Sequence, residues 1–149
     1  MKGFSALETI IAITVAGILL AIITNSFQIS RIKKNQDEIV ETIASSLEEQ
    51  KTNSQTGKEG FSYGVKFNID SFVLFRGEYQ QASSNNKIIA IEPQFQISDS
   101  LINMDNIVSF SKILGDASEN ATITISHIDN RISPKNIVIK KTGTISVIE

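Results

Sequence analysis

The stretch that decides the fold of this chain is GFSALETIIAITVAGILLAII, residues 3–23. Its only ionisable residue is Glu8, and a run of 14 almost purely aliphatic residues covers positions 10–23. No ionisable side chain occurs in residues 9–30, so uncharged residues extend the run. A membrane-spanning helix needs about 20 apolar residues, whereas about 10–14 are typical of a signal-peptide core or an interfacial segment. The extended segment therefore predicts a membrane span with a polar outer end.

The helical pattern continues beyond this run. An apolar stripe with spacings of three, four and seven residues follows on one helix face, formed by Ile29, Ile32, Ile39, Ile43 and Leu47. Charged residues occupy the other faces: Arg31, Lys33, Lys34, Asp37, Glu38, Glu41, Glu48 and Glu49. No proline interrupts residues 4–50, so the pattern predicts one helix about 70 Å long. Residues 52–60, rich in turn formers, would end it.

From Phe61 the apolar period changes to two residues, which is typical of a half-buried strand. The alternating positions are Phe61, Tyr63, Val65, Phe67 and Ile69. Further strands are predicted at residues 72–76, 87–91, 94–97, 107–110, 122–126, 137–140 and 145–148, with a hairpin turn at 141–144. The predicted fold class is α+β: a long N-terminal helix, membrane-embedded in its first half, packs its stripe on a C-terminal antiparallel β domain.

The composition argues against several classes of function. The formal charge of −2 provides no electrostatic basis for nucleic-acid binding. The chain has no cysteine, so neither a disulfide framework nor thiolate chemistry is available. Its one histidine, His127, has no second histidine or cysteine with which to hold a metal, and the sequence has no hydrolase or nucleotide-binding motif. We expect no enzymatic activity, no cofactor and no metal site.

Glu8 is the residue whose position most needs an explanation. An ionised, unpaired carboxylate at the start of a membrane segment costs on the order of 3 kcal/mol. A cut between Gly3 and Phe4 would create an α-amino group, a cation near neutral pH, close to Glu8 of the same or a neighbouring subunit. Glu8 would then set the register between chains, because its carboxylate is energetically unfavourable in an apolar surrounding until it pairs with an amino terminus. Ser5 and Glu8 also match a capping box, a role compatible with the first.

This N-terminal stretch, from Gly3 through the aliphatic run, resembles the class III signal of type IV prepilins. The resemblance implies that a prepilin peptidase cuts after Gly3, on the cytoplasmic side, and methylates the new N-terminal residue, Phe4. It also implies that Glu8 guides assembly with other pilin or pseudopilin subunits. The pair Ser5-Ala6 departs from the commoner Thr-Leu or Ser-Leu, which bears on methylation more than on cleavage.

A second resemblance covers parts of the β domain. Residues 63–67 with 72–77 resemble the opening hairpin of H-type minor pseudopilins, and residues 137–139 with 143–147 resemble their final strands. Because the chain has no cysteine, it cannot form the disulfide-bounded loop of many major pilins, which favours a pseudopilin or minor subunit. The expected function is that of a structural subunit, a minor pilin or pseudopilin, in a type IV pilus or a type II secretion pseudopilus.

These resemblances imply four parts along the chain. Residues 1–3 are a leader peptide, 4–30 the hydrophobic transmembrane and assembly helix, 31–51 its amphipathic continuation, and 52–149 an extracytoplasmic β domain. The protein would be stored in the cytoplasmic membrane as a single-pass protein with its C-terminal domain outside. An inner-membrane assembly platform would then move it from the lipid bilayer into an extracytoplasmic filament.

Two other functions stay open. A signal-anchored binding module or adhesin would keep the membrane segment without cleavage at Gly3, and the polar residues 79–86 are the hint for it. A minor pilin for DNA uptake would need clustered basic residues, of which Lys135, Lys140 and Lys141 are a small start. An ordinary secretory signal fits less well, because residues 24–26 are a poor cleavage site.

Overall fold

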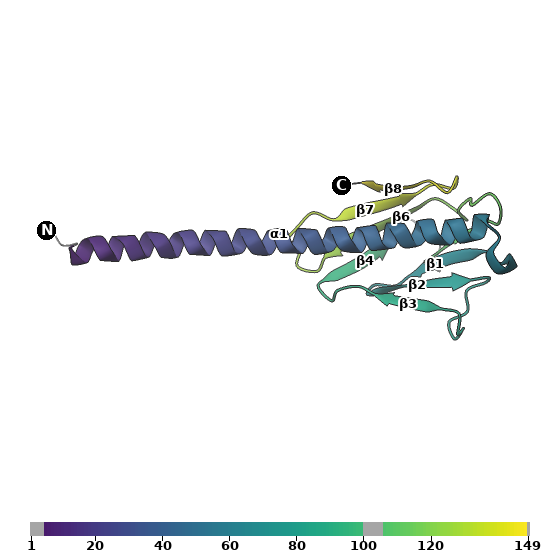
Figure 1. Ribbon diagram of the computed structural model, residues 1–149, viewed down its shortest axis with the longest axis horizontal. Helices are drawn as coiled ribbons and strands as arrows, with labels where there is room; N and C mark the ends of the chain where they lie inside the picture. Colours follow the sequence, from purple (N-terminus) through teal and green to yellow (C-terminus); the bar gives the residue numbers. More distant parts are fainter. Residues whose placement is uncertain (1–4, 100–105, 149) are drawn as a thin grey trace. The chain divides into compact units, whose positions relative to one another are not determined.

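A computed structural model describes residues 5–99 and 106–148 of the chain. It contains one long helix, α1 (Ala6–Gln55), and a short 3-10 helix, η1 (Lys58–Gly60). Eight strands follow (Figure 1): β1 (Tyr63–Phe67), β2 (Ser71–Arg76), β3 (Lys87–Ala90), β4 (Phe95–Asp99), β5 (Ile107–Phe110), β6 (Ala121–His127), β7 (Lys135–Ile139) and β8 (Ile145–Ile148). The chain divides into two compact units, Met1–Lys34 and Asn35–Glu149, which are described separately.

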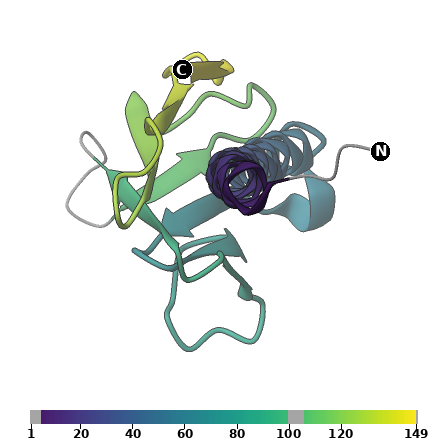
Figure 2. The same cartoon turned by 90° about the vertical axis from the view of Figure 1, so that its left-hand side faces the viewer.

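The second unit contains two four-stranded antiparallel sheets. The strand order is β3-β2-β1-β5 in one sheet and β4-β6-β7-β8 in the other. The turns of α1 that belong to this unit lie beside the sheets (Figures 1 and 2). Four apolar residues on one face of these turns are buried: Ile39, Val40, Ile43 and Leu47. The predicted α+β class, with a helix packed on an antiparallel β domain, is confirmed.

Strand β6 illustrates how the sequence builds the core of the second unit. Ala121, Ile123, Ile125 and His127 are buried, and the residues between them are only half-buried. Side chains of a strand alternate between the two faces of its sheet, so these four positions share one face. β6 is central in its sheet, paired with β4 on one side and β7 on the other.

All eight predicted strands are present, with ends that differ by up to two residues. The prediction was wrong for Ile69, which lies outside β1 and is 71% exposed. The alternation stops at Phe67 because Asn68 turns the chain: its backbone N–H donates to the Ser71 carbonyl at 2.8 Å. Phe61, at 45% exposure, also lies outside the strand.

The end of α1 differs from the prediction as well. The helix continues to Gln55, whereas residues 52–55 were expected to begin a turn. Ser54 is buried, and its Oγ accepts a hydrogen bond from the Tyr63 backbone N–H at 2.8 Å. The Gln55 side chain donates to the Leu114 carbonyl at 3.0 Å. These tertiary hydrogen bonds hold the last turn in helical form although its residues have low helix propensity.

Candidate assembly site

The first unit carries a continuous apolar surface on α1. Every described residue from position 5 to position 28 is exposed, including Leu7 at 68%, Ile13 at 68% and Phe27 at 71%. An 18-residue window of this helix has a mean hydropathy of 2.5, and the helix is long and apolar enough to cross a membrane. An apolar patch of this size on a soluble monomer would be unusual. The surface is therefore suited to contact with lipid or with apolar protein.

Two threonines within this surface donate hydrogen bonds to their own helix. The Thr14 hydroxyl donates to the Ile10 carbonyl at 2.8 Å, and the Thr24 hydroxyl donates to the Leu20 carbonyl at 3.0 Å. A hydroxyl that bonds back to its own helix needs no water, which suits a nonaqueous surrounding. The threonines are therefore compatible with a lipid or helix-bundle environment.

Glu8 is the only acidic residue of the first helical turn. Its carboxylate Oε2 accepts a hydrogen bond from the Ser5 backbone N–H at 3.4 Å, and its own N–H donates to Ser5 Oγ at 3.3 Å. These reciprocal contacts form the capping box indicated by the sequence. The side chain remains exposed, so the carboxylate is open to a further partner. Gly3 and Phe4, the other two predicted site residues, lie outside the described residues.

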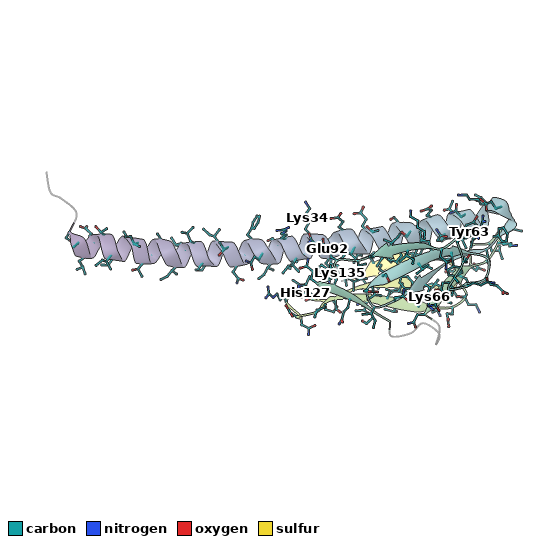
Figure 3. The ribbon with its side chains drawn as sticks, turned by 90° about the horizontal axis from the view of Figure 1, so that it is seen from below. Lys34, Tyr63, Lys66, Glu92, His127 and Lys135 are labelled. Carbon is teal, nitrogen blue, oxygen red and sulfur yellow. The ribbon has the colours of Figure 1, made fainter. Side chains whose placement is uncertain are left out.

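Three consecutive residues at the start of the second unit attach α1 to three different segments. Asn35 Nδ2 donates to the Glu92 carboxylate at 2.9 Å. Gln36 Nε2 donates to the carbonyls of Ile125 and Ser133, at 3.0 and 3.1 Å. The third contact is an ion pair of 2.9 Å between Asp37 and Lys135. Figure 3 labels Glu92 and Lys135 beside the helix.

Gln36 is a residue that the sequence reasoning missed. It is 1% exposed and lies on the apolar stripe, three residues before Ile39. That spacing could have identified Gln36 from the sequence, since a polar residue at a stripe position must find hydrogen-bond partners inside the protein. The buried amide uses the only two donors of a glutamine side chain on backbone carbonyls.

His127 is built into the core. Its side chain is 4% exposed and lies edge-on against Phe95, with ring centroids 5.5 Å apart. Its Nδ1 accepts a hydrogen bond from the Asp129 backbone N–H at 3.1 Å. Residues 5–99 and 106–148 contain no group of three or more His, Cys, Asp or Glu side chains that could hold a metal ion. The geometry assigns His127 a packing role.

The loop 79–86 contributes its aromatic residue to the fold. Tyr79 packs edge-on against Phe75, with centroids 5.3 Å apart. Lys66 Nζ lies 4.5 Å from the centroid of the Tyr79 ring. The tyrosine thus covers a buried residue of β2. This internal role weakens the one sequence hint of a binding module.

No protein-family model and no curated protein sequence matches the chain. Among solved structures, it is similar to the minor pseudopilin EpsH from the type 2 secretion system of Vibrio cholerae, with a TM-score of 0.57. The match covers 76% of this chain and 96% of that chain, at 12% sequence identity. A likeness at this identity reports on the fold alone. The chain has the type IV pilin-like fold, with a long N-terminal helix whose later turns pack on antiparallel sheets.

Proposed function

We propose that this protein is a structural subunit, a minor pilin or pseudopilin, of a type IV pilus or a type II secretion pseudopilus. The observation that carries the proposal is Glu8, an exposed carboxylate on an otherwise uncharged, apolar stretch of α1. The pilin-like fold supports the same function. In a filament, the apolar helices of neighbouring subunits would surround one another and replace the lipid around this surface.

Processing creates a cationic partner for Glu8. A prepilin peptidase cuts between Gly3 and Phe4 and methylates the amino group of Phe4. The cation at this new terminus then pairs with Glu8 of a neighbouring subunit. Because an unpaired carboxylate in an apolar surrounding is costly, only the axial position that joins the two charges is favourable. The charge pair therefore sets the stagger between adjacent helices.

The proposal places the protein in the cytoplasmic membrane before assembly, as a single-pass protein with residues 52–149 outside. An inner-membrane assembly platform moves it from the bilayer into the filament. Its partners are other pilin or pseudopilin subunits, and it acts without a cofactor and without catalysis.

The first test is the intact mass and N-terminal sequence of the membrane-extracted protein, produced together with a prepilin peptidase. The expected product is a chain that starts at methylated Phe4. A chain that still starts at Met1 would contradict processing and indicate a signal-anchored binding module. A start near Phe27 would indicate an ordinary secreted protein instead.

The second test separates the charge of Glu8 from its capping role. Glu8→Gln removes the charge but keeps an acceptor for the Ser5 N–H, because Glu and Gln both serve in a capping box. We expect cleaved, folded protein in the membrane and little of it in filaments sheared from cells that contain the assembly machinery. Ser5→Ala is the matched control, which weakens the cap and leaves the charge. Normal filament incorporation of the Glu8→Gln variant would overturn the pairing.

A further inference from the structure

A pocket of about 240 Å³ opens beside the last turns of α1, and most of the charged side chains in its wall are basic. Lys58 and Lys87 line it, and neither forms an ion pair with any residue in the described ranges 5–99 and 106–148. Arg76 lines it too, but its guanidinium is already paired with Glu59. Among the described residues of the wall, one is acidic, Glu49. The two unpaired cations outweigh it, so the pocket is suited to an anionic ligand.

Gln50 of α1 places a buried amide in the same pocket. Its side chain is 5% exposed and forms no hydrogen bond with any described residue, in contrast to the side chain of Gln36. In the part of the chain that the structure describes, no buried side-chain nitrogen or oxygen is fully enclosed without a partner, so the Gln50 amide reaches the open pocket that it lines. An amide both donates and accepts hydrogen bonds, which suits a ligand that carries an acceptor and an N–H side by side.

The strand that borders this pocket, β3, has an unpaired edge. It is the outer strand of its sheet (Figure 1). The Ile91 backbone N–H donates to the Asp70 carbonyl at 3.0 Å, so the alternation of an antiparallel pair points the N–H and C=O groups of Ile88 and Ala90 away from β2. Neither residue uses these groups in a hydrogen bond to another described residue. Such an edge can accept an extended peptide as an additional strand.

The direction of β3 connects its edge to the pocket. The strand runs from Lys87 to Ala90, and Lys87 belongs to the pocket wall. A strand antiparallel to β3 runs the opposite way and therefore ends beside Lys87. We propose that the pocket binds the C-terminal carboxylate of an extended segment of a partner protein, which adds to β3 as an antiparallel strand. Lys58 and Lys87 pair with the carboxylate, and the Gln50 amide bonds to the last peptide group. The inference goes beyond the proposed function, because it does not depend on filament assembly.

The other end of β3 adds a requirement on the partner's sequence. A second pocket, of about 140 Å³, is lined there by Ile91 and by two acidic residues, Glu38 and Glu92. Neither carboxylate forms an ion pair within the described parts of the chain. In the added strand, the residue opposite Ile91 lies four positions before the residue opposite Lys87, and its side chain is on the same side of the sheet as that of Ile91. A basic residue four positions before the C terminus therefore fits the second pocket.

The test measures the binding of a labelled peptide to the full chain in detergent by fluorescence polarisation. The peptide is Arg-Thr-Val-Thr-Val with fluorescein on its N terminus, because threonine and valine favour strands and the arginine lies four positions before the end. The matched control is the same peptide with a C-terminal amide, which lacks only the negative charge. The acid should bind at least about tenfold more tightly than the amide, since hydrogen bonds to a charged group are the stronger ones. Glutamate in place of the arginine should also weaken binding.

Two further changes separate the carboxylate contact from the strand pairing. Lys87→Gln should reduce the advantage of the acid over the amide and leave the affinity for the amide unchanged, whereas Lys140→Gln, at an exposed position on another strand end, should change neither. N-methylation of the penultimate threonine removes the N–H that faces Ile88 and should lower the affinity about fivefold. The matched control methylates the central valine, whose N–H points away from β3, and should have little effect.

Four outcomes would overturn the proposal. The absence of binding at about 1 mM peptide would exclude the site. Equal affinities for the acid and the amide would exclude recognition of the carboxylate. Equal effects of the two methylations would exclude pairing with β3. Displacement of the peptide by free glutarate at an equal concentration would mean that the pocket serves a small dicarboxylate instead. Each of these measurements uses unassembled protein, so each failure would leave the proposed function standing.

Discussion

At the scale of single residues, Gln36 links α1 to the β-sheet part of the second unit. Its amide donates to the carbonyls of Ile125 and Ser133 in a position that is 1% exposed. A buried carbonyl that loses its donor costs more than an average hydrogen bond contributes, because water cannot replace the donor. Gln36 therefore fixes the rotation of the helix against the sheets, and its neighbours Asn35 and Asp37 reinforce that position.

Gln36→Leu is expected to lower the free energy of unfolding of the second unit by about 1–3 kcal/mol, since it removes both hydrogen bonds of the buried amide. Urea unfolding of the full chain in detergent, followed by tyrosine fluorescence, measures this. Gln28→Leu is the matched control at an exposed position, with an expected change within about 0.5 kcal/mol. Equal unfolding midpoints for the two variants would contradict the role of Gln36.

At the scale of elements, the close approach of β1 to its neighbours depends on Gly64. In register, Gly64 lies opposite Phe75 of β2 and Ser109 of β5. A Cβ at this position would lie 2.5 Å from Phe75 Cζ and 2.7 Å from the Val108 carbonyl oxygen. The backbone atom cannot move without shifting β5, so the central strand tolerates no side chain here.

Gly64→Ala should therefore lower the free energy of unfolding by about 1–3 kcal/mol through overpacking. Gly17→Ala is the matched control, because a Cβ at Gly17 meets nothing within 4 Å. Thermal unfolding followed by the β-sheet circular dichroism signal measures both. If Gly64→Ala unfolds at the same temperature as Gly17→Ala, β1 is less tightly packed than the contacts indicate.

At the scale of the whole molecule, the two units differ in how much of their apolar surface is exposed. The described part of the first unit exposes apolar side chains along α1, whereas the second unit has a buried apolar core between helix and sheets that includes Ile43, Phe67 and Ile123. An element that buries nothing within its own chain contributes little to the stability of the rest. Folding of the second unit is accordingly expected not to depend on residues 1–27.

A chain without residues 1–27 should stay soluble without detergent, keep its β-sheet signal and unfold at the urea concentration found for the full chain. Removal of residues 1–37 is the control, because it also deletes the contacts of Asn35, Gln36 and Asp37 and should lower the unfolding midpoint. Circular dichroism and size-exclusion chromatography measure both. Aggregation of the shorter deletion would show that the second unit needs the apolar segment.

The sequence by itself determined the α+β class, all eight strands and the apolar segment with Glu8 at its start. These features depend on local patterns: an uninterrupted apolar run, a helical stripe and a period of two each extend over neighbouring residues. The capping box of Ser5 and Glu8 was predictable for the same reason, since its two partners are three residues apart.

Only the tertiary structure decided which residues along these patterns meet partners far away in the chain. Gln36 is separated from Ile125 by 89 residues, and Ser54 accepts its hydrogen bond from the first residue of β1. Tyr79, in the polar stretch 79–86 that hinted at a binding module, packs on Phe75. Such pairings depend on the order of strands in the two sheets, which no local period encodes. The physical reason is that hydrogen-bond partners and close packing are set by the folded backbone, whereas periodicity records only which face of an element is apolar.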